Sequence, residues 1–333
     1  MENISLLNST GDQRIDNILR GAIGIFETIF PDRIRGYYLV GSYADGTAVS
    51  TSDIDMKILF KNRFRDNAER KNSQLICEYC FGLISPIAGD VTARDEETAF
   101  SSSTLRLRIK AGSLLLYGED IRDQISLPPL DQHIRDVMFR AYVFCFTDRL
   151  RPNLKARVYP LDYPDPSDEF YGYTYKGGTT VFVSVVSAVA TAIVASKSKK
   201  YVFTKNDCLK LYKKYINDEW TALLEAAFEK IRRQWEYQIP ENKDERRQLR
   251  EICRQTLAFE NHFLIIYKDF LLTELRDAED KDKLPAVKRL GEIIYLGEEI
   301  LGVLKALESC ANRETREVVN NTINWIRQMR EKN

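Results

Sequence analysis

The chain has 333 residues, of which 44% are hydrophobic and 29% charged, and 49 Lys and Arg residues balance 49 Asp and Glu residues. This is the composition of a soluble globular protein, and the length allows one large domain or two of ordinary size. The equal charges exclude a global basic field that would draw the protein to nucleic acid or to a membrane. Six scattered cysteines and the lack of a signal-peptide pattern at the N-terminus lead us to expect a cytoplasmic location.

The first elements predicted along the chain are a helix and two strands. Apolar residues at helical spacing predict an amphipathic helix over residues 12–30. The apolar run 37–40 predicts a buried strand, and Gly41 ends it, because glycine tolerates backbone angles that are closed to other residues. A loop with several turn-forming residues follows. A second strand then opens with Asp53 and Asp55.

The two aspartates are expected to share one face of the second strand, because residues two apart in a strand point the same way. Ile54 and its alternate neighbours line the other face, as core residues do. Adjacent carboxylates repel each other, and Mg²⁺ removes the conflict, since it binds one or two carboxylates and completes its shell with water and substrate phosphates. Backbone N–H groups and the hydroxyl at Gly41 and Ser42 can hold a phosphate beside that metal. The pattern predicts a metal-dependent nucleotide site; the alternative is an edge strand with two solvated aspartates.

A third carboxylate is expected from Asp90, at the start of a short strand over residues 90–93. It follows a segment, 65–80, with a weak helical pattern. This carboxylate would complete the metal shell or accept a proton from an attacking hydroxyl group. Three neighbours in a run of charges compete for the role, and they are Asp95, Glu96 and Glu97.

The rest of the chain is predicted to be helical apart from a buried strand or turn at 114–120. Pro128 and Pro129 mark a domain boundary. The run from 181 to 196 is small and apolar, but it is shorter than the roughly 20 residues that span a bilayer, so we expect a buried helix. Helical patterns cover residues 101–113, 131–149, 179–196, 205–216, 220–237, 244–275, 283–308 and 312–330.

Residues 152–178 interrupt the helices with four prolines, five tyrosines and several carboxylates. Loops of this length are usually functional or disordered. We keep two interpretations open, a surface that receives a cationic, hydroxyl-rich ligand and a solvated connector.

Gly41-Ser42, a spacing of ten residues and then Asp53-Ile54-Asp55 together resemble the signature of the DNA-polymerase-β-like nucleotidyltransferase superfamily. The resemblance implies a small mixed sheet flanked by helices. It also implies Mg²⁺ held by the aspartate pair and transfer of a nucleoside monophosphate from a triphosphate.

Further motifs resemble the aminoglycoside nucleotidyltransferases within that superfamily. Residues 114–120 are a leucine-rich run ending in Tyr-Gly-Glu-Asp. Asp90 lines up with the glutamate of a Glu-Val-Thr motif, which implies a catalytic base, but Asp is one methylene shorter, so base and metal ligand both stay open. Lys205 lines up with the lysine of a Ser-Lys-x-x-Ala motif, which implies a side chain facing the nucleotide phosphates. Residues 232–237, Arg-x-x-Trp-x-Tyr, also resemble the helical domain of these enzymes.

These observations predict an α+β enzyme with a nucleotidyltransferase domain of mixed sheet and flanking helices at residues 1–126. An all-α domain at 127–333 would close over the substrate and nucleotide. The predicted reaction transfers AMP from ATP, or another nucleotide from its triphosphate, to a hydroxyl group of a small and cationic acceptor, with two Mg²⁺ ions as cofactor. Membrane and nucleic-acid partners are not expected, and the C-terminal helices provide a surface for oligomerisation. The predicted site residues are Asp53, Asp55 and Asp90 as catalytic groups and metal ligands, and Gly41, Ser42 and Lys205 as nucleotide-binding groups.

Other functions stay open at this stage. Gly46-Thr47 inside the loop is compatible with a nucleotide second-messenger synthase, which needs no added acceptor. An enzyme that modifies a protein or a tRNA is a variant of the main prediction. A non-catalytic nucleotide-binding or interaction protein is the third possibility, and the intact aspartate pair argues against it.

Overall fold

The computed structural model describes residues 4–85, 87, 89–147, 150–151, 158–277, 280–292, 295, 298–310 and 312–331. The residues group into two compact units. The sheet unit comprises residues 1–137, 194–217 and 232–236, and the helical unit comprises residues 138–193, 218–231 and 237–333. This grouping differs from the predicted division at residue 126, because two later segments return to the sheet unit.

The sheet unit follows the predicted order of elements. The helix expected over 12–30 and the strands expected around 37–40 and 53–60 are confirmed, and the strand at Asp90 is longer than expected. Elements that lie wholly in this unit are α1 (Gln13–Ile29), β1 (Ile34–Val40), β2 (Ile54–Phe60), α2 (Asn67–Leu75), η1 (Ile76–Cys80), α3 (Phe81–Ile84), β3 (Gly89–Asp95), α4 (Glu96–Ser101), α5 (Ser103–Ala111), β4 (Ser113–Gly118), η2 (Arg122–Gln124) and α8 (Lys205–Tyr215).

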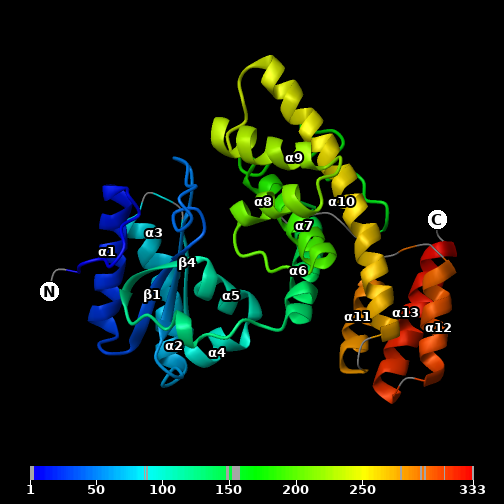
Figure 1. The fold of residues 1–333 in the computed structure, drawn as a ribbon, viewed down its shortest axis with the longest axis horizontal. Helices are drawn as coiled ribbons and strands as arrows, with labels where there is room; N and C mark the ends of the chain where they lie inside the picture. Colours follow the sequence, from blue (N-terminus) through cyan, green and yellow to red (C-terminus); the bar gives the residue numbers. More distant parts are fainter. Residues whose placement is uncertain are drawn as a thin grey trace. The chain divides into compact units, whose positions relative to one another are not determined.

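The four strands form one mixed sheet in the order β3-β2-β1-β4. β1 is antiparallel to β2 and to β4, whereas β2 and β3 are parallel. α1 covers one face of the sheet, and α4 and α5 lie on the other (Figure 1). On the second face the apolar cluster includes Leu59 of β2 and Ile109 of α5. Asp55, near the start of β2, is not part of this cluster, so this end of the strand is left to polar groups.

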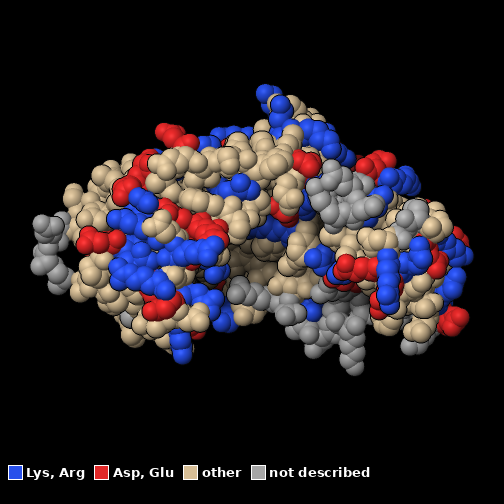
Figure 2. All heavy atoms as spheres, turned by 90° about the horizontal axis from the view of Figure 1, so that it is seen from below, with Lys and Arg blue, Asp and Glu red and all other residues tan. Residues whose placement is uncertain are grey.

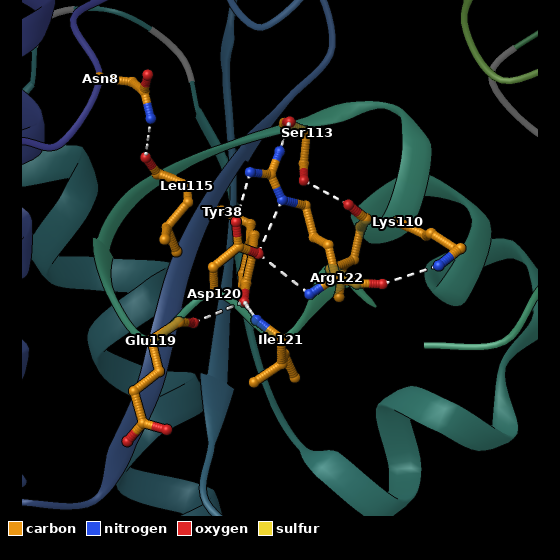
Figure 3. A network of polar contacts seen from close by, with 10 residues as sticks. Asn8, Tyr38, Lys110, Ser113, Leu115, Glu119, Asp120, Ile121 and Arg122 are labelled. Atoms are coloured by element: carbon orange, nitrogen blue, oxygen red, sulfur yellow. Dashed lines mark hydrogen bonds and ion pairs between the residues drawn. The ribbon is translucent and has the colours of Figure 1, made fainter. Parts of the chain in front are cut away.

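The Tyr-Gly-Glu-Asp segment ends β4 and forms a polar network (Figure 3). Both carboxylate oxygens of Asp120 accept hydrogen bonds from the Arg122 guanidinium, at 2.9 and 2.6 Å. This contact lowers the pKa of Asp120. The same guanidinium donates to the carbonyl of Ser113 at 3.1 Å, and the Tyr38 hydroxyl donates to the carbonyl of Glu119 at 3.0 Å. The network therefore ties both ends of β4 to the turn that follows it and to β1.

The helical unit contains a buried ion pair. Arg151 and Glu260 are 3% and 0% exposed, and the guanidinium donates to the carboxylate at 2.8 and 3.0 Å. The Tyr173 hydroxyl donates to the same carboxylate. The helices of this unit are α9 (Thr221–Glu225), α10 (Lys243–Asp277), α11 (Asp280–Glu292), α12 (Glu298–Cys310) and α13 (Arg313–Glu331), while α6 (Leu130–Cys145), α7 (Thr180–Ser198) and η3 (Ala226–Gln234) have residues in both units.

The predicted α+β fold with a helical second half is thus confirmed, with one difference in the last third of the chain. The periodic run 283–308 contains the end of α11 and most of α12 rather than one helix. α11, α12 and α13 pack against one another, and α10 packs against α11 and α12. Figure 1 shows these helices side by side at the C-terminal end of the chain.

The loop predicted over 152–178 is ordered against α10 where the structure describes it, and its first part, 152–157, lies outside the described residues. Glu169 accepts a hydrogen bond from Arg246 at 2.8 Å. The guanidinium of Arg250 lies 5.0 Å from the centre of the Tyr171 ring. Because these acidic and aromatic groups already contact basic side chains of the helical unit, the connector interpretation is the better supported of the two.

One described helix, α7, is long and apolar enough to cross a membrane by length and composition, and 67% of its most apolar window is buried. Its central residues, such as Val189 and Ile193, have 0% exposure. The expectation of a buried helix is confirmed in this respect.

Charged side chains of both signs are interspersed on the face shown in Figure 2. In the sheet unit, basic residues near the ends of β1 and β2 lie beside carboxylates. Arg33 pairs with Glu69 at 2.7 Å, and Arg35 pairs with Glu96 at 2.7 Å. The positive charges of these two arginines are therefore balanced by neighbouring carboxylates.

Replacing Ile58 by alanine should lower the free energy of unfolding of the sheet unit by about 2–5 kcal/mol, because the side chain is buried in the core and a cavity would remain. Ile58 is 1% exposed, whereas Leu83 of α3 is 86% exposed. Leu83→Ala is therefore the matched control and should change stability by no more than about 0.5 kcal/mol. Urea denaturation, followed by hydrogen exchange of peptides from β1 and β2, measures the stability change caused by each substitution. Equal effects of the two substitutions would contradict the assigned core.

Candidate active site

The site begins at Gly41, directly after β1. Its φ angle is +75°, in the left-handed region that favours glycine. A Cβ atom added there would lie 2.3 Å from Oδ2 of Asp55. The backbone therefore approaches the carboxylate more closely than any other residue type would allow.

A tight turn follows Gly41. The backbone N–H groups of Ala44 and Asp45 both donate to the Gly41 carbonyl at 3.1 Å. The N–H groups of Ser42 and Tyr43 donate no hydrogen bond to any residue that the structure describes. A turn with free N–H donors is a suitable binding site for a phosphate group.

Asp53 and Asp55 lie at the start of β2, as predicted. Asp53 is exposed and Asp55 half-buried, while Ile54 between them is buried in the core. Burial and the negative charge of Asp53 raise the pKa of Asp55 to about 6, against the opposing effect of Lys57. Neither aspartate side chain forms a hydrogen bond or ion pair within the described part of the chain. The pair therefore concentrates negative charge that a cation would stabilise.

Asp90 lies beside this pair. β2 and β3 are parallel and in register, so that Asp55 is opposite Asp90, and paired residues of neighbouring strands point to the same face. The Asp90 side chain is 54% exposed, and its Oδ2 accepts a hydrogen bond from the Lys57 ammonium at 3.0 Å. Among the described residues, no group of three or more His, Cys, Asp or Glu is arranged to hold a metal ion. A metal-binding role for Asp90 therefore stays a prediction.

The three carboxylates that competed with Asp90 all have partners within the sheet unit. Asp95 caps α4 by accepting from the N–H of Thr98 at 2.8 Å. Glu96 pairs with Arg35, and Glu97 pairs with Arg63. These pairings favour Asp90 over its neighbours.

Lys205 reaches the same region from the first turn of α8. Thr204 caps this helix, and a Cβ added at Gly112, at the end of α5, would lie 3.7 Å from the Thr204 methyl group. The pKa of Lys205 is lowered, mainly because protein atoms crowd the ammonium and next because Arg232 is close, while Asp53 and Asp55 act in the opposite direction. Solvent still reaches the residue, which is exposed. The cation of Lys205 thus lies within electrostatic range of the aspartate pair.

Comparison with known proteins agrees with this geometry. The sequence model of the family described as "Nucleotidyltransferase domain" matches residues 19–98, which hold the Gly41 turn, both aspartates and Asp90. Residues 19–98 therefore match a nucleotidyltransferase domain, which is typical of a transferase, an enzyme that moves a nucleotidyl group.

A solved structure is also similar to the chain, that of spectinomycin adenyltransferase AAD(9) from Enterococcus faecialis with ATP and spectinomycin. The sequence identity is 10% and the TM-score 0.46, over 73% of this chain and 98% of that chain. A comparison with curated protein sequences finds no significant match.

Several residues near the candidate site were not predicted. The Arg232 guanidinium, on a residue only 4% exposed, donates to the Thr47 hydroxyl at 2.6 Å. The Thr51 hydroxyl donates to the carbonyl of Glu236 at 2.6 Å, and the Ser50 hydroxyl bonds the Glu236 carboxylate. Residues 232–236 thus hold the loop between the turn and the aspartates. More than 180 residues separate the partners, so local sequence carried no signal for these contacts.

Lys57 was missed although a signal was present. Asp53, Asp55 and Lys57 follow the period of two residues that places side chains on one strand face. A lysine at the third position of this series pointed to a cation beside the carboxylates.

Gly41→Ala should remove nucleotide transfer by displacing the Asp55 carboxylate, whereas Gly46→Ala should have a much smaller effect. Both glycines have positive φ angles, +75° and +69°, but a Cβ at Gly46 would meet nothing within 4 Å. The pair therefore separates the steric clash from backbone strain, which costs of order 1–3 kcal/mol at either position. Steady-state kinetics and thermal unfolding of the two variants test this, and equal losses of activity would contradict it.

The raised pKa of Asp55 should make stability depend on pH in the absence of metal. The unfolded carboxyl titrates near 3.8 and the folded one near 6. The contribution of Asp55 to the free energy of unfolding is therefore fully present below pH 3.8. It is lost as the pH rises through 6, and the loss is about 3 kcal/mol at most. Asp55→Asn lacks this loss, so it should be more stable than the wild type at pH 7 and similar to it near pH 4.

Urea denaturation with a chelator, at pH 4 to 7, measures this difference. Asp120→Asn is the control of opposite sign, because hydrogen bonds from Arg122 lower the pKa of Asp120. That variant should lose stability at pH 7 and lose less as the pH falls. A stability difference for Asp55→Asn that does not change with pH would contradict the assignment.

Proposed function

We propose that the sheet unit transfers AMP from ATP to a hydroxyl group of a small, aminoglycoside-like acceptor and releases pyrophosphate. The observation that carries the proposal is the in-register pairing of Asp55 with Asp90 beside the Gly41 turn. Within a nucleotidyltransferase domain, this arrangement puts a candidate metal site, a phosphate site and a candidate base on neighbouring strand ends.

The nucleotide phosphates would bind at the turn. The free N–H groups of Ser42 and Tyr43 donate to phosphate oxygens, and the Lys205 ammonium offsets their negative charge. Lys205 forms no ion pair within the described residues, so it is available to a ligand.

Asp53 and Asp55 fit a divalent cation. They are neighbouring oxygen donors, and burial and then the negative charge of Asp53 raise the pKa of Asp55. No described basic group bonds to either carboxylate. When bound, Mg²⁺ would neutralise charge on the triphosphate and polarise the α-phosphate.

Asp90 is the candidate base. In the proposed step the acceptor hydroxyl attacks the α-phosphorus in line with the leaving group, and its proton passes to the carboxylate of Asp90. The new P–O bond forms as the bond to the β-phosphate bridging oxygen breaks, and pyrophosphate leaves near Lys205. Asp90 is exposed enough to meet an acceptor, and of its two carboxylate oxygens only Oδ2 accepts a hydrogen bond from Lys57.

The acceptor class rests on sequence and on charge. The segment 114–120 resembles aminoglycoside nucleotidyltransferases and forms β4 and its network. The exposed carboxylates of Asp53 and Asp90 would attract the amino groups of a cationic acceptor. The neutral overall charge and the paired arginines of the sheet unit give no support to a tRNA acceptor.

Asp53→Asn should reduce transfer by about 10³-fold or more, because metal binding supplies several kcal/mol of transition-state stabilisation. The variant should fold and be at least as stable as the wild type, since Asp53 is exposed, is unpaired within the described residues and raises the pKa of Asp55. The assay is pyrophosphate release with Mg²⁺ and ATP, alone and with each member of an aminoglycoside panel, and mass spectrometry identifies the adenylylated product. Asp123→Asn, an exposed aspartate of η2, is the matched control.

Release that requires an aminoglycoside would support the proposal. Release from ATP or another triphosphate without any acceptor would replace it with a second-messenger synthase. Near-wild-type activity of Asp53→Asn, or no release with any acceptor, would contradict the proposal.

A further inference from the structure

Lys57 is a buried cation inside an acidic site. It lies on the same face of β2 as Asp53 and Asp55, and its side chain is only 8% exposed. Placing an ammonium group out of water is costly unless a counter-ion accompanies it. The burial of Lys57 therefore requires a negatively charged group close to its ammonium.

Its hydrogen-bonded partner in the described chain is Asp90. The ammonium donates to Oδ2 of Asp90 at 3.0 Å and to the Asp90 carbonyl at 3.2 Å. It also acts electrostatically on Asp55, which is in register with Asp90 on the next strand. One fixed positive charge thus serves two carboxylates that face the same side of the sheet.

This geometry bears on the number of metal ions. In two-metal sites the ions lie about 3.5–4 Å apart and are held between carboxylates. The Lys57 ammonium already bonds the carboxylate that would complete such a set, and a second divalent ion there would be repelled by it. No described group of three carboxylates is arranged for a metal ion.

We infer that Lys57 takes the place of a second metal ion. The site would bind one divalent ion, at Asp53 and Asp55, while Lys57 holds Asp90 free of metal and oriented to accept a proton. Lys57 is then a positioning residue. The inference refines the expectation of two Mg²⁺ ions. Its role for Asp90 as proton acceptor rests on the proposed function, but the metal count does not.

The test is a titration of the full chain with Mn²⁺ alone, without nucleotide, in which electron paramagnetic resonance measures the bound ion. The wild type should bind about one ion per chain and Lys57→Met about two, because Asp90 becomes available as a ligand. Lys57→Met keeps the length and apolar character of the side-chain stem. The double variant with Asp90→Asn should return to about one ion, and Lys57→Arg, which keeps the charge, should also bind about one.

Lys61→Met is the matched control for loss of a positive charge. Lys61 directly follows β2 at its other end and lies 3.9 Å from Glu119, so its replacement should not change the count. Circular dichroism melting of each variant verifies folding.

Three results would overturn the inference: two ions bound to the wild type, no ion bound to the wild type or to Lys57→Met, or one ion bound to Lys57→Met. The activity assay is independent of this count. A protein that binds metal as described but transfers no nucleotide would contradict the proposed function and leave the role of Lys57 in metal binding intact.

Discussion

The close approach of the Gly41 backbone to the Asp55 carboxylate is the constraint on which the site depends. A Cβ atom would fall 2.3 Å from the carboxylate oxygen, so this contact needs glycine and links the end of β1 to the start of β2. It also brings the free N–H groups of the turn next to a carboxylate whose pKa is raised to about 6 by burial and by Asp53. One short contact thereby makes the proposed phosphate site and the proposed cation site adjacent.

Around this contact, cations compensate crowded negative charge. Lys57 bonds Asp90 from within the sheet, and Lys205 approaches from α8. Arg232 holds the intervening loop through Thr47. Lys57 is committed to a protein carboxylate, whereas Lys205 has no such partner among the described residues. The first therefore organises the site, and the second is available to a ligand.

Local patterns predicted the elements that carry the chemistry. The helical spacing before β1 predicted α1, and the alternation from Asp53 to Phe60 predicted which face of β2 is buried. Asp95, which competed with Asp90 for a site role, instead caps α4, and the role of Asp90 stays a prediction. The domain boundary differed from the compact units, since residues 194–217 and 232–236 join the sheet unit through contacts that no local pattern records.

The sequence by itself determined the strand, turn and strand that hold Gly41, Asp53 and Asp55. Their proposed roles rest on residue type and a spacing of a few residues, which set backbone freedom and strand face. Only the tertiary structure decided which distant cations complete the site. Asp90 is paired with Lys57 by the register of two parallel strands, and Lys205 and Arg232 join the site across more than a hundred residues of chain. Such pairings depend on how the elements pack, because the interaction of two charges depends on their separation in space and not on their separation along the sequence.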